Sequence, residues 1–283
     1  MVSGSDMHGT PITVTAQQEG KTPEQVAMEY HKLNSDSIER MGISFDLFSH
    51  THTEEHAEVA LSILKKLDEN GYIEPRISEE PYDPIANQFL PDRYVEGTCP
   101  HCNYESARGD QCDDCGKTLD SKELINPRSK LNPDAKIEFR ETEHLFFKLS
   151  EFRDVLLDWL SEGKEHWRSS VINFTRNWLK EGLIDRAVTR DLDWGIEIPR
   201  EGYENKRMYV WFEAVMGYYS ASVHWAKNQG KPEEWKKWWE NEDSEHYYFM
   251  AKDNIPFHTI IWPAMLSGCG YKLPYDVPAN EYL

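Results

Sequence analysis

Four of the five cysteines form two closely spaced pairs, Cys99–Cys102 and Cys112–Cys115. Each pair presents two thiolates from a tight turn, and four thiolates in a tetrahedron are a ligand set that zinc prefers. Because such a closed site leaves no open position for water, we predict one structural Zn²⁺ rather than a catalytic ion. Four unpaired thiols, disulfides or a redox pair are the alternatives. Cys269 stands apart, and we interpret it as a structural thiol.

Three other segments, residues 6–8, 211–218 and 251–262, carry polar and aromatic side chains where strands are expected to end. In an open α/β sheet, ligands bind at the carboxyl ends of the strands. We therefore predict that the three segments line one small-ligand pocket. Asp6 would face a ligand ammonium group, and Asp253 would face a pair of sugar hydroxyls. The predicted aromatic walls are Trp211, Tyr218 and Trp262, with His258 on the same helix face as Trp262.

Each of these residues also has a simpler interpretation. A single Trp or Tyr is more often a core residue, and a single His on an aromatic face is more often a hydrogen-bonded core histidine. Asp6 could be a turn or helix-cap residue. Spacing and composition alone identify an α/β protein with a zinc knuckle and a candidate small-ligand cleft.

The composition limits the classes of partner. The formal net charge of −19 argues against a general electrostatic attraction to nucleic acid or to an anionic membrane, although a local basic groove remains compatible with it. No stretch is apolar for long enough to span a membrane, and we expect no signal peptide. Clustered cysteines are typical of metal ligands in a reducing compartment, so we expect a cytoplasmic protein.

Capping signals and apolar spacing predict the elements that position these residues. A strand is expected at the start of the chain, ending around residues 6–10, and residues 13–21 are interpreted as a polar, turn-like stretch. The other predicted strands are residues 43–48, 208–212 and 247–250. The predicted helices are 23–40, 53–70, 151–160, 169–181, 213–227, 232–240 and 256–266.

The composition changes after Tyr72, where Pro, Gly, Asp and Asn become frequent. Residues 73 to about 146 are interpreted as a loop-rich module of short strands. We therefore predict an α/β fold in three parts: residues 1–72 and 207–283 belong to one catalytic domain, and residues 73–206 form an insert with the zinc knuckle at 97–116.

Four motifs together resemble methionyl-tRNA synthetase of the archaeal type. They are GSDMHGTPI at 4–12, the knuckle at 97–116, YVWFEA with GY at 209–218, and AKDNIPFH with IWPAM at 251–265. The resemblance covers the whole chain in order. It implies a class I synthetase with a Rossmann-type catalytic domain that a zinc-containing connective insert divides. The family activates methionine with ATP and Mg²⁺ to methionyl-adenylate and transfers methionyl to tRNA(Met) during protein biosynthesis.

The resemblance also implies roles for individual residues. Asp6 would hold the methionine ammonium group. The residues around the methionine side chain would be Trp211, Ala214, Tyr218, His258 and Trp262. Asp253 would contact the ATP ribose, and Ala251 stands beside the nucleotide where the family often has Gly. Arg190 would be an arginine of the insert that reaches toward the active site as a catalytic residue.

Two family signatures are not found in the 283 residues. The HIGH sequence is expected before Met1 and the KMSKS sequence after Leu283, and both stabilise the reacting phosphates electrostatically. We therefore expect a fragment of the enzyme that is inactive by itself. The alternatives are a non-catalytic, zinc-stabilised module that binds methionine or a partner, and one piece of a split synthetase that other synthetase fragments complete.

Overall fold

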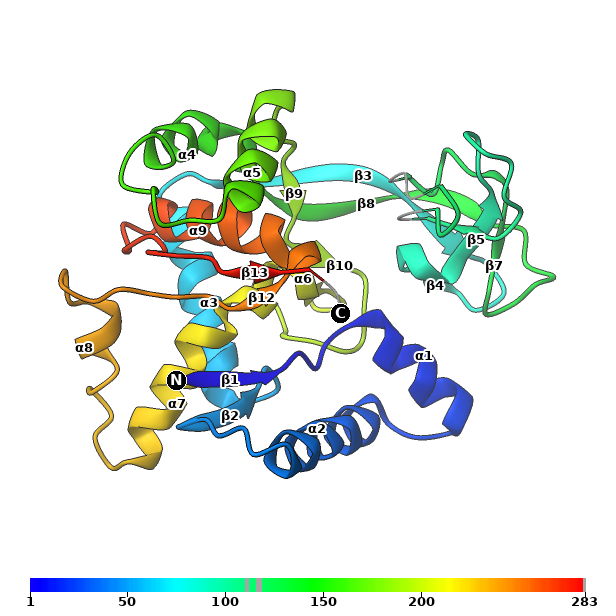
Figure 1. The fold of residues 1–283 in the computed structure, drawn as a ribbon. Coiled ribbons are helices and arrows are strands. Elements are labelled where there is room, and N and C mark those ends of the chain that lie inside the picture. The colour runs from blue at the N-terminus through cyan, green and yellow to red at the C-terminus, as the bar shows by residue number, and fades with distance from the viewer. Residues whose placement is uncertain (110–111, 116–118, 282–283) are drawn as a thin grey trace. The chain divides into compact units, whose positions relative to one another are not determined.

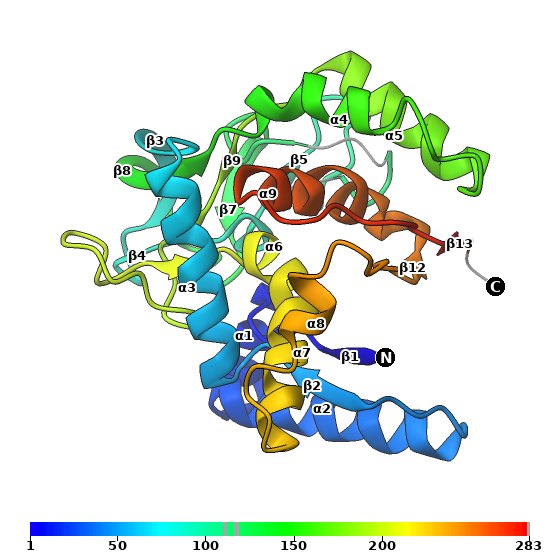
Figure 2. The same ribbon diagram turned by 90° about the vertical axis from the view of Figure 1, so that its left-hand side faces the viewer.

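The computed structural model describes residues 1–109, 112–115 and 119–281, and the chain divides into two compact units (Figures 1 and 2). Unit 1 comprises Met1–Glu74, Phe146–Val188 and Met208–Leu283. Unit 2 comprises Pro75–Leu145 and Thr189–Arg207. The described part of the chain contains no helix with the length and apolar character needed to cross a membrane.

Unit 1 contains two pairs of parallel strands. β1 (Val2–Ser5) pairs with β2 (Leu47–His50), and β12 (Met250–Ala251) pairs with β13 (Ala279–Asn280). Parallel pairing with helical connections is the α/β architecture that the sequence predicted.

The helices of unit 1 connect and cover these strands. The α-helices are α1 (Thr10–Glu19), α2 (Pro23–Arg40), α3 (Glu54–Glu69), α4 (Arg153–Trp159), α5 (Ser169–Glu181), α6 (Val210–Glu213), α7 (Gly217–Asn228), α8 (Lys236–Trp239) and α9 (Trp262–Gly268). Shorter turns are η2 (Leu149–Phe152), η3 (Ala214–Met216), η4 (Lys252–Asn254) and the π-turn η5 (Phe257–Ile261). α3 and α7 lie side by side (Figure 2).

Local sequence explains where the long helices begin. Thr22 accepts a hydrogen bond from the Gln25 backbone, and the Gln25 side chain accepts one from the Thr22 backbone, so a complete capping box starts α2. In α3, buried apolar side chains recur at helical spacing, and these are Val59, Ala60, Ile63, Leu64 and Leu67. The bounds of α2 and α5 are those predicted from the sequence.

Some predicted elements are wrong in part. The strand predicted at 43–48 is β2 at Leu47–His50, and the strand predicted at 247–250 is β12 at Met250–Ala251. Residues 13–19 of the stretch 13–21 are not turn-like but lie in α1, because Gly9 and Pro11 start a helix and Ala16 is buried against its neighbours. The predicted strand 208–212 is only β11 (Arg207–Met208), and the chain then turns into α6. An apolar run of this length fits a buried strand and a buried helical turn equally well.

Unit 2 contains most of the antiparallel structure. Its strands are β4 (Gln88–Phe89), β5 (Val95–Thr98), β6 (Ala107–Arg108), β7 (Ile125–Ser129) and β10 (Thr189–Arg190), with the turn η1 (Asp92–Tyr94) before β5. β3 (Ile73–Asp83) and β8 (Glu138–Phe147) continue from one unit into the other, and β9 (Arg186–Ala187) pairs with β8 in unit 1. At 11 and 10 residues, β3 and β8 are longer than the short strands we predicted.

The units group one segment differently from the predicted three-part division. Residues 146–188, which the sequence analysis placed in the insert, belong to unit 1. The physical reason is that α4 and α5 bury side chains there, with Leu156 and Val171 fully enclosed. The domain boundaries at 72 and 206 remain a prediction.

Candidate functional site

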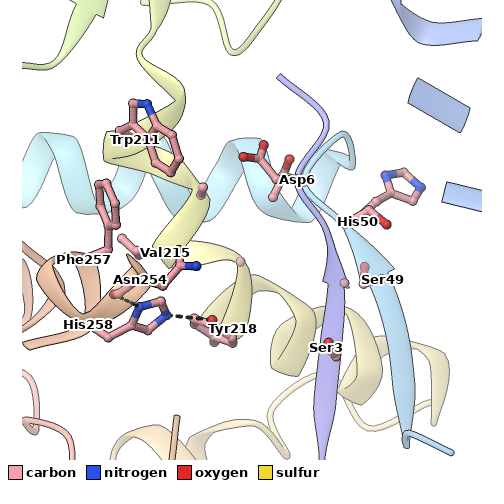
Figure 3. Close-up of a pocket in the computed structure, with 15 residues that line it drawn as sticks. Ser3, Asp6, Ser49, His50, Trp211, Val215, Tyr218, Asn254, Phe257 and His258 are labelled. Atoms are coloured by element: carbon pink, nitrogen blue, oxygen red, sulfur yellow. Dashed lines mark hydrogen bonds between the residues drawn. The ribbon is translucent and has the colours of Figure 1, made fainter. Parts of the chain in front are cut away.

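A cavity of about 200 Å³ lies in unit 1, beside the carboxyl ends of β1 and β2 (Figure 3). Five of the six residues predicted to surround methionine line it: Asp6, Trp211, Ala214, Tyr218 and His258. The first follows β1, and the others come from α6, η3, α7 and η5. Residues more than 200 positions apart in the sequence therefore line one cavity.

Tyr218 and His258 form a hydrogen-bonded pair in this wall (Figure 3). His258 Nδ1 lies 2.9 Å from the carbonyl oxygen of Asn254, so that nitrogen donates and Nε2 accepts from the Tyr218 hydroxyl at 2.7 Å. Burial lowers the pKa of His258 to about 4 and raises the pKa of Tyr218 to about 12. The pair is therefore uncharged near neutral pH and presents a polarizable, neutral surface.

The outer wall is aromatic. Trp211 stacks on Phe257 with ring centroids 4.5 Å apart and an interplanar angle of 17° (Figure 3). Trp211 is 43% exposed, so one face of the pair is open to a ligand. Phe257 was not predicted as a site residue, although it stands within the motif at 251–258.

Asp6 is solvent-accessible, and its carboxylate points toward the segment that carries Trp211 (Figure 3). Its Oδ1 accepts a hydrogen bond from the backbone of His8 at 3.3 Å. Desolvation by the surrounding protein, together with the negative charge of Glu213, raises the pKa of Asp6 to about 7. A cation that binds next to Asp6 would therefore favour the ionised form of its carboxyl group.

Behind Asp6 lies a buried acid that the sequence analysis missed. Glu213 is fully buried and accepts hydrogen bonds from His8 Nδ1 at 2.8 Å and from His56 Nε2 at 2.6 Å. Burial opposes its ionisation, but these bonds hold the pKa of Glu213 below its usual range. The contacts span 205 and 157 positions, so no local pattern in the sequence could reveal them.

The end of β2 was also missed. Ser49, His50 and Thr51 line the cavity opposite the aromatic wall. The available signal was that the predicted strand 43–48 ends just before these residues, as β1 ends just before Asp6.

Unit 2 contains the predicted cysteine cluster. The four Sγ atoms of Cys99, Cys102, Cys112 and Cys115 all lie within 4.8 Å of one another. Two of the separations are 3.9 Å and 3.6 Å, close to the roughly 3.8 Å expected between thiolates around tetrahedral zinc. All four are free thiols, so the disulfide alternative is not realised. The cluster fits a metal ion; residues 110, 111 and 116 of the predicted knuckle lie outside the described residues.

Residues 1–283 match the family described as class I tRNA synthetases (M). The chain belongs to this family.

Relatives and solved structures agree with this assignment. The chain is 59% identical to methionine–tRNA ligase of Dehalococcoides mccartyi strain 195, 54% to that of Thermomicrobium roseum and 50% to that of Thermoplasma volcanium. All of this chain is covered, but only 51%, 48% and 52% of the relatives. The chain therefore spans about half the length of the curated relatives it matches.

The fold is that of solved enzymes of the family. Mycobacterium tuberculosis methionyl-tRNA synthetase bound by methionyl-adenylate superimposes with a TM-score of 0.70 at 20% identity. The match covers 100% of this chain and 49% of that one. It confirms the class I synthetase fold.

In this class I synthetase chain, three predicted site residues of unit 1 do not line the cavity. Trp262 is fully buried and donates from Nε1 to the Tyr248 hydroxyl at 3.0 Å, one layer behind Tyr218. Ala251 ends β12, and Asp253 is exposed in η4. Their assignments to methionine and to ATP remain predictions.

Arg190 lies on β10 in unit 2, where its Nη1 donates to the carbonyl oxygen of Thr189 at 3.2 Å. The next residue, Asp191, accepts from Lys206 at 2.6 Å and from Thr142 at 3.0 Å. A buried polar network therefore anchors the strand end that carries Arg190, whose catalytic role remains a prediction.

Proposed function

We propose that the protein containing this chain is a methionine–tRNA ligase. It activates methionine with ATP and Mg²⁺ to methionyl-adenylate, releases pyrophosphate, and transfers methionyl to tRNA(Met). The observation that carries this proposal is the convergence of five predicted methionine-binding residues on one cavity. The names of the relatives, methionine–tRNA ligase, support the same substrate and reaction.

In this proposal the cavity binds methionine by its two ends. Asp6 accepts the ammonium group, and ion pairing would keep the carboxylate ionised despite its raised pKa. The neutral Tyr218–His258 pair and the face of Trp211 contact the thioether, since aromatic rings make favourable contacts with a polarizable sulfur. A neutral His258 avoids placing a cation against the apolar side chain.

The nucleotide would occupy the region next to η4. Asp253 would hold the ATP ribose and Ala251 would lie beside the nucleotide, and Arg190 would be a catalytic residue contributed by the insert. An exposed carboxylate at the end of a parallel strand suits a pair of sugar hydroxyls.

We further propose that Cys99, Cys102, Cys112 and Cys115 hold one structural Zn²⁺ and that the protein is cytoplasmic. The four sulfur atoms supply every ligand of a tetrahedral ion, so the metal would cross-link the β5–β7 region rather than contact substrate.

By itself, the 283-residue chain is expected to bind methionine without activating it, because neither HIGH nor KMSKS occurs in its sequence. Calorimetry with methionine and with a non-reactive methionyl-adenylate analogue, together with ATP–pyrophosphate exchange, tests this. Asp6→Asn is the control for binding at this cavity.

Each outcome separates the alternatives. Exchange at the rate of a full-length synthetase would refute the requirement for the two signatures. Methionine binding without any affinity for the adenylate analogue would favour a non-catalytic binding module. Exchange that appears only when other synthetase fragments are added would favour a split enzyme. No binding of either ligand, with the fold intact, would refute the proposed site.

A further inference from the structure

Glu213 is a fully buried acid to which the proposed reaction assigns no role. A fully buried carboxylate costs free energy unless its partners compensate for the lost water. Here the compensation comes from two histidines on different segments, His8 after β1 and His56 in α3. His56 is itself held through Nδ1 by the Ser220 hydroxyl at 2.8 Å.

These bonds join the segments that form the cavity. His8 is two residues after Asp6, and its backbone N–H donates to the Asp6 carboxylate. Glu213 ends α6, which carries Trp211, and it directly precedes Ala214. One carboxylate therefore links the ammonium side of the cavity with the aromatic side.

We propose that Glu213 is a positioning residue of this site: its two carboxylate oxygens hold His8 and His56, fix the Asp6 turn against α6, and place a buried negative charge near Asp6. The inference rests on the proposed function where the test measures methionine affinity. It assigns Glu213 no contact with substrate, since Glu213 is not among the residues that line the cavity.

The electrostatic part of the proposal follows from the groups that surround Asp6 and Glu213. His8 and His56 face Glu213, and His52 lies behind His8, with Nδ1 3.1 Å from His8 Nε2. Desolvation is the larger cause of the raised pKa of Asp6, the charge of Glu213 is the second, and His8 acts in the opposite direction. Removing the charge of Glu213 should therefore lower the pKa of Asp6 without returning it to its usual value.

The test compares Glu213→Gln, which keeps the size and one acceptor but loses the charge, with Glu213→Asp, which keeps the charge. Glu69→Gln is the matched control, because Glu69 is an exposed acid of α3 paired with Lys65. The carboxyl ¹³C signal of Asp6 is followed against pH in the ligand-free chain. Methionine affinity is measured by calorimetry at pH 6 and pH 7.5.

For wild type and Glu69→Gln, we expect Asp6 to titrate near pH 7 and methionine to bind about eightfold more tightly at pH 7.5 than at pH 6. In Glu213→Gln the Asp6 midpoint should fall, and the affinity ratio should shrink to about twofold. Glu213→Asp should keep the wild-type ratio. An unchanged Asp6 midpoint in folded Glu213→Gln, or the same loss of ratio in Glu213→Asp, would overturn the inference.

If Glu213→Gln does not fold, the Asp6 midpoint of Glu213→Asp provides the second measurement. This variant keeps the buried negative charge, so the Asp6 midpoint should stay near 7. A fall of the midpoint in Glu213→Asp would overturn the inference. The Asp6 titration needs no ligand, so failure of methionine to bind would refute the proposed function while leaving the coupling between Glu213 and Asp6 measurable.

Discussion

The hydroxyl of Tyr218 donates to Nε2 of His258 across 2.7 Å, and this bond joins two side chains of the cavity wall. His258 Nδ1 is committed to the carbonyl oxygen of Asn254, so the imidazole has one defined tautomer. A lowered pKa for His258 and a raised pKa for Tyr218 keep the pair neutral across the physiological range. The wall of the cavity therefore offers a thioether a polarizable surface without a net charge.

Replacing Tyr218 by Phe should weaken both the fold and methionine binding. The change removes the donor to His258 and leaves a buried acceptor unsatisfied, which costs about 1–3 kcal/mol. Urea unfolding measures the stability, and calorimetry measures the affinity. Tyr247→Phe is the control, because the Tyr247 hydroxyl is bonded to Glu245 at the surface. Equal stability of the Tyr218 and Tyr247 variants would contradict the role of this bond.

Methionine binding should strengthen as pH rises through neutrality. Asp6 has a pKa of about 7 in the ligand-free chain, so its ionised fraction increases about eightfold between pH 6 and pH 7.5. Calorimetry across this range measures the effect. In Asp6→Asn the affinity should fall about 10- to 100-fold at pH 7.5, since a charge-assisted hydrogen bond is lost. A pH dependence that survives in Asp6→Asn would assign the titration to another group.

Asp6 should also affect folding stability with a defined sign. Its folded-state pKa is raised above the unfolded value, so the folded chain binds more protons between about pH 4 and pH 7. The contribution of Asp6 to stability is therefore fully present below about pH 4 and is lost as the pH rises to 7. Thermal unfolding should show Asp6→Asn gaining stability relative to wild type over this interval. A constant difference between the two at pH 4 and pH 7 would contradict the raised pKa.

The cysteine cluster should bind about one zinc ion per chain in freshly purified, reduced protein. Cys112→Ser should lose the metal, because Cys112 supplies one of four converging sulfur atoms. Cys269→Ala should retain it, since Cys269 lies in unit 1 with its thiol directed to the carbonyl oxygen of Ile63. Elemental analysis measures the content. Wild-type protein without zinc would refute the structural site.

Local patterns in the sequence predicted the elements that depend on local chemistry. The capping box at Thr22 and Gln25 gave α2, and the spacing of the four cysteines gave the metal cluster. The family resemblance added Ala214 to the pocket residues and implied that they bind methionine. The polar support of that wall was not predictable, because Glu213 meets its histidines only after distant segments pack together. The same holds for α1, whose polar sequence becomes helical through Pro11 and the packing of Ala16.

Gly4→Ala should destabilise the parallel pair β1–β2. A Cβ at Gly4 would lie 2.6 Å from the carbonyl oxygen of Ser49, and backbone atoms cannot move aside easily. Overpacking of this kind typically costs about 1–3 kcal/mol, which thermal unfolding would detect. Gly9→Ala is the control, because its added Cβ would approach only Pro11, at 3.4 Å. A melting temperature equal to that of Gly9→Ala would show that the strands can separate to admit the methyl group.

The network beside Arg190 gives a prediction for unit 2. Lys206 is largely buried, and its ammonium group donates to Asp191 at 2.6 Å and to Thr142 at 2.7 Å. Asp191→Asn would leave that charge without its anion, at a cost of about 3–5 kcal/mol. Hydrogen–deuterium exchange of β8 and β10 measures the local stability. Glu197→Gln is the control, since Glu197 is exposed and its pair with Arg207 should contribute less than about 1 kcal/mol.

The contribution of the same network to folding stability should decrease in acid. Burial opposes the ionisation of Asp191, but its bonds to His144 and Lys206 lower the pKa of Asp191 below the usual value. A lowered folded-state pKa contributes stability above the unfolded pKa of about 4, and that stability is lost as the pH falls through the folded value. The difference in exchange between wild type and Asp191→Asn should therefore be largest near neutral pH and shrink below pH 4. A difference that grows on acidification would reverse the sign and refute the ionised form of Asp191.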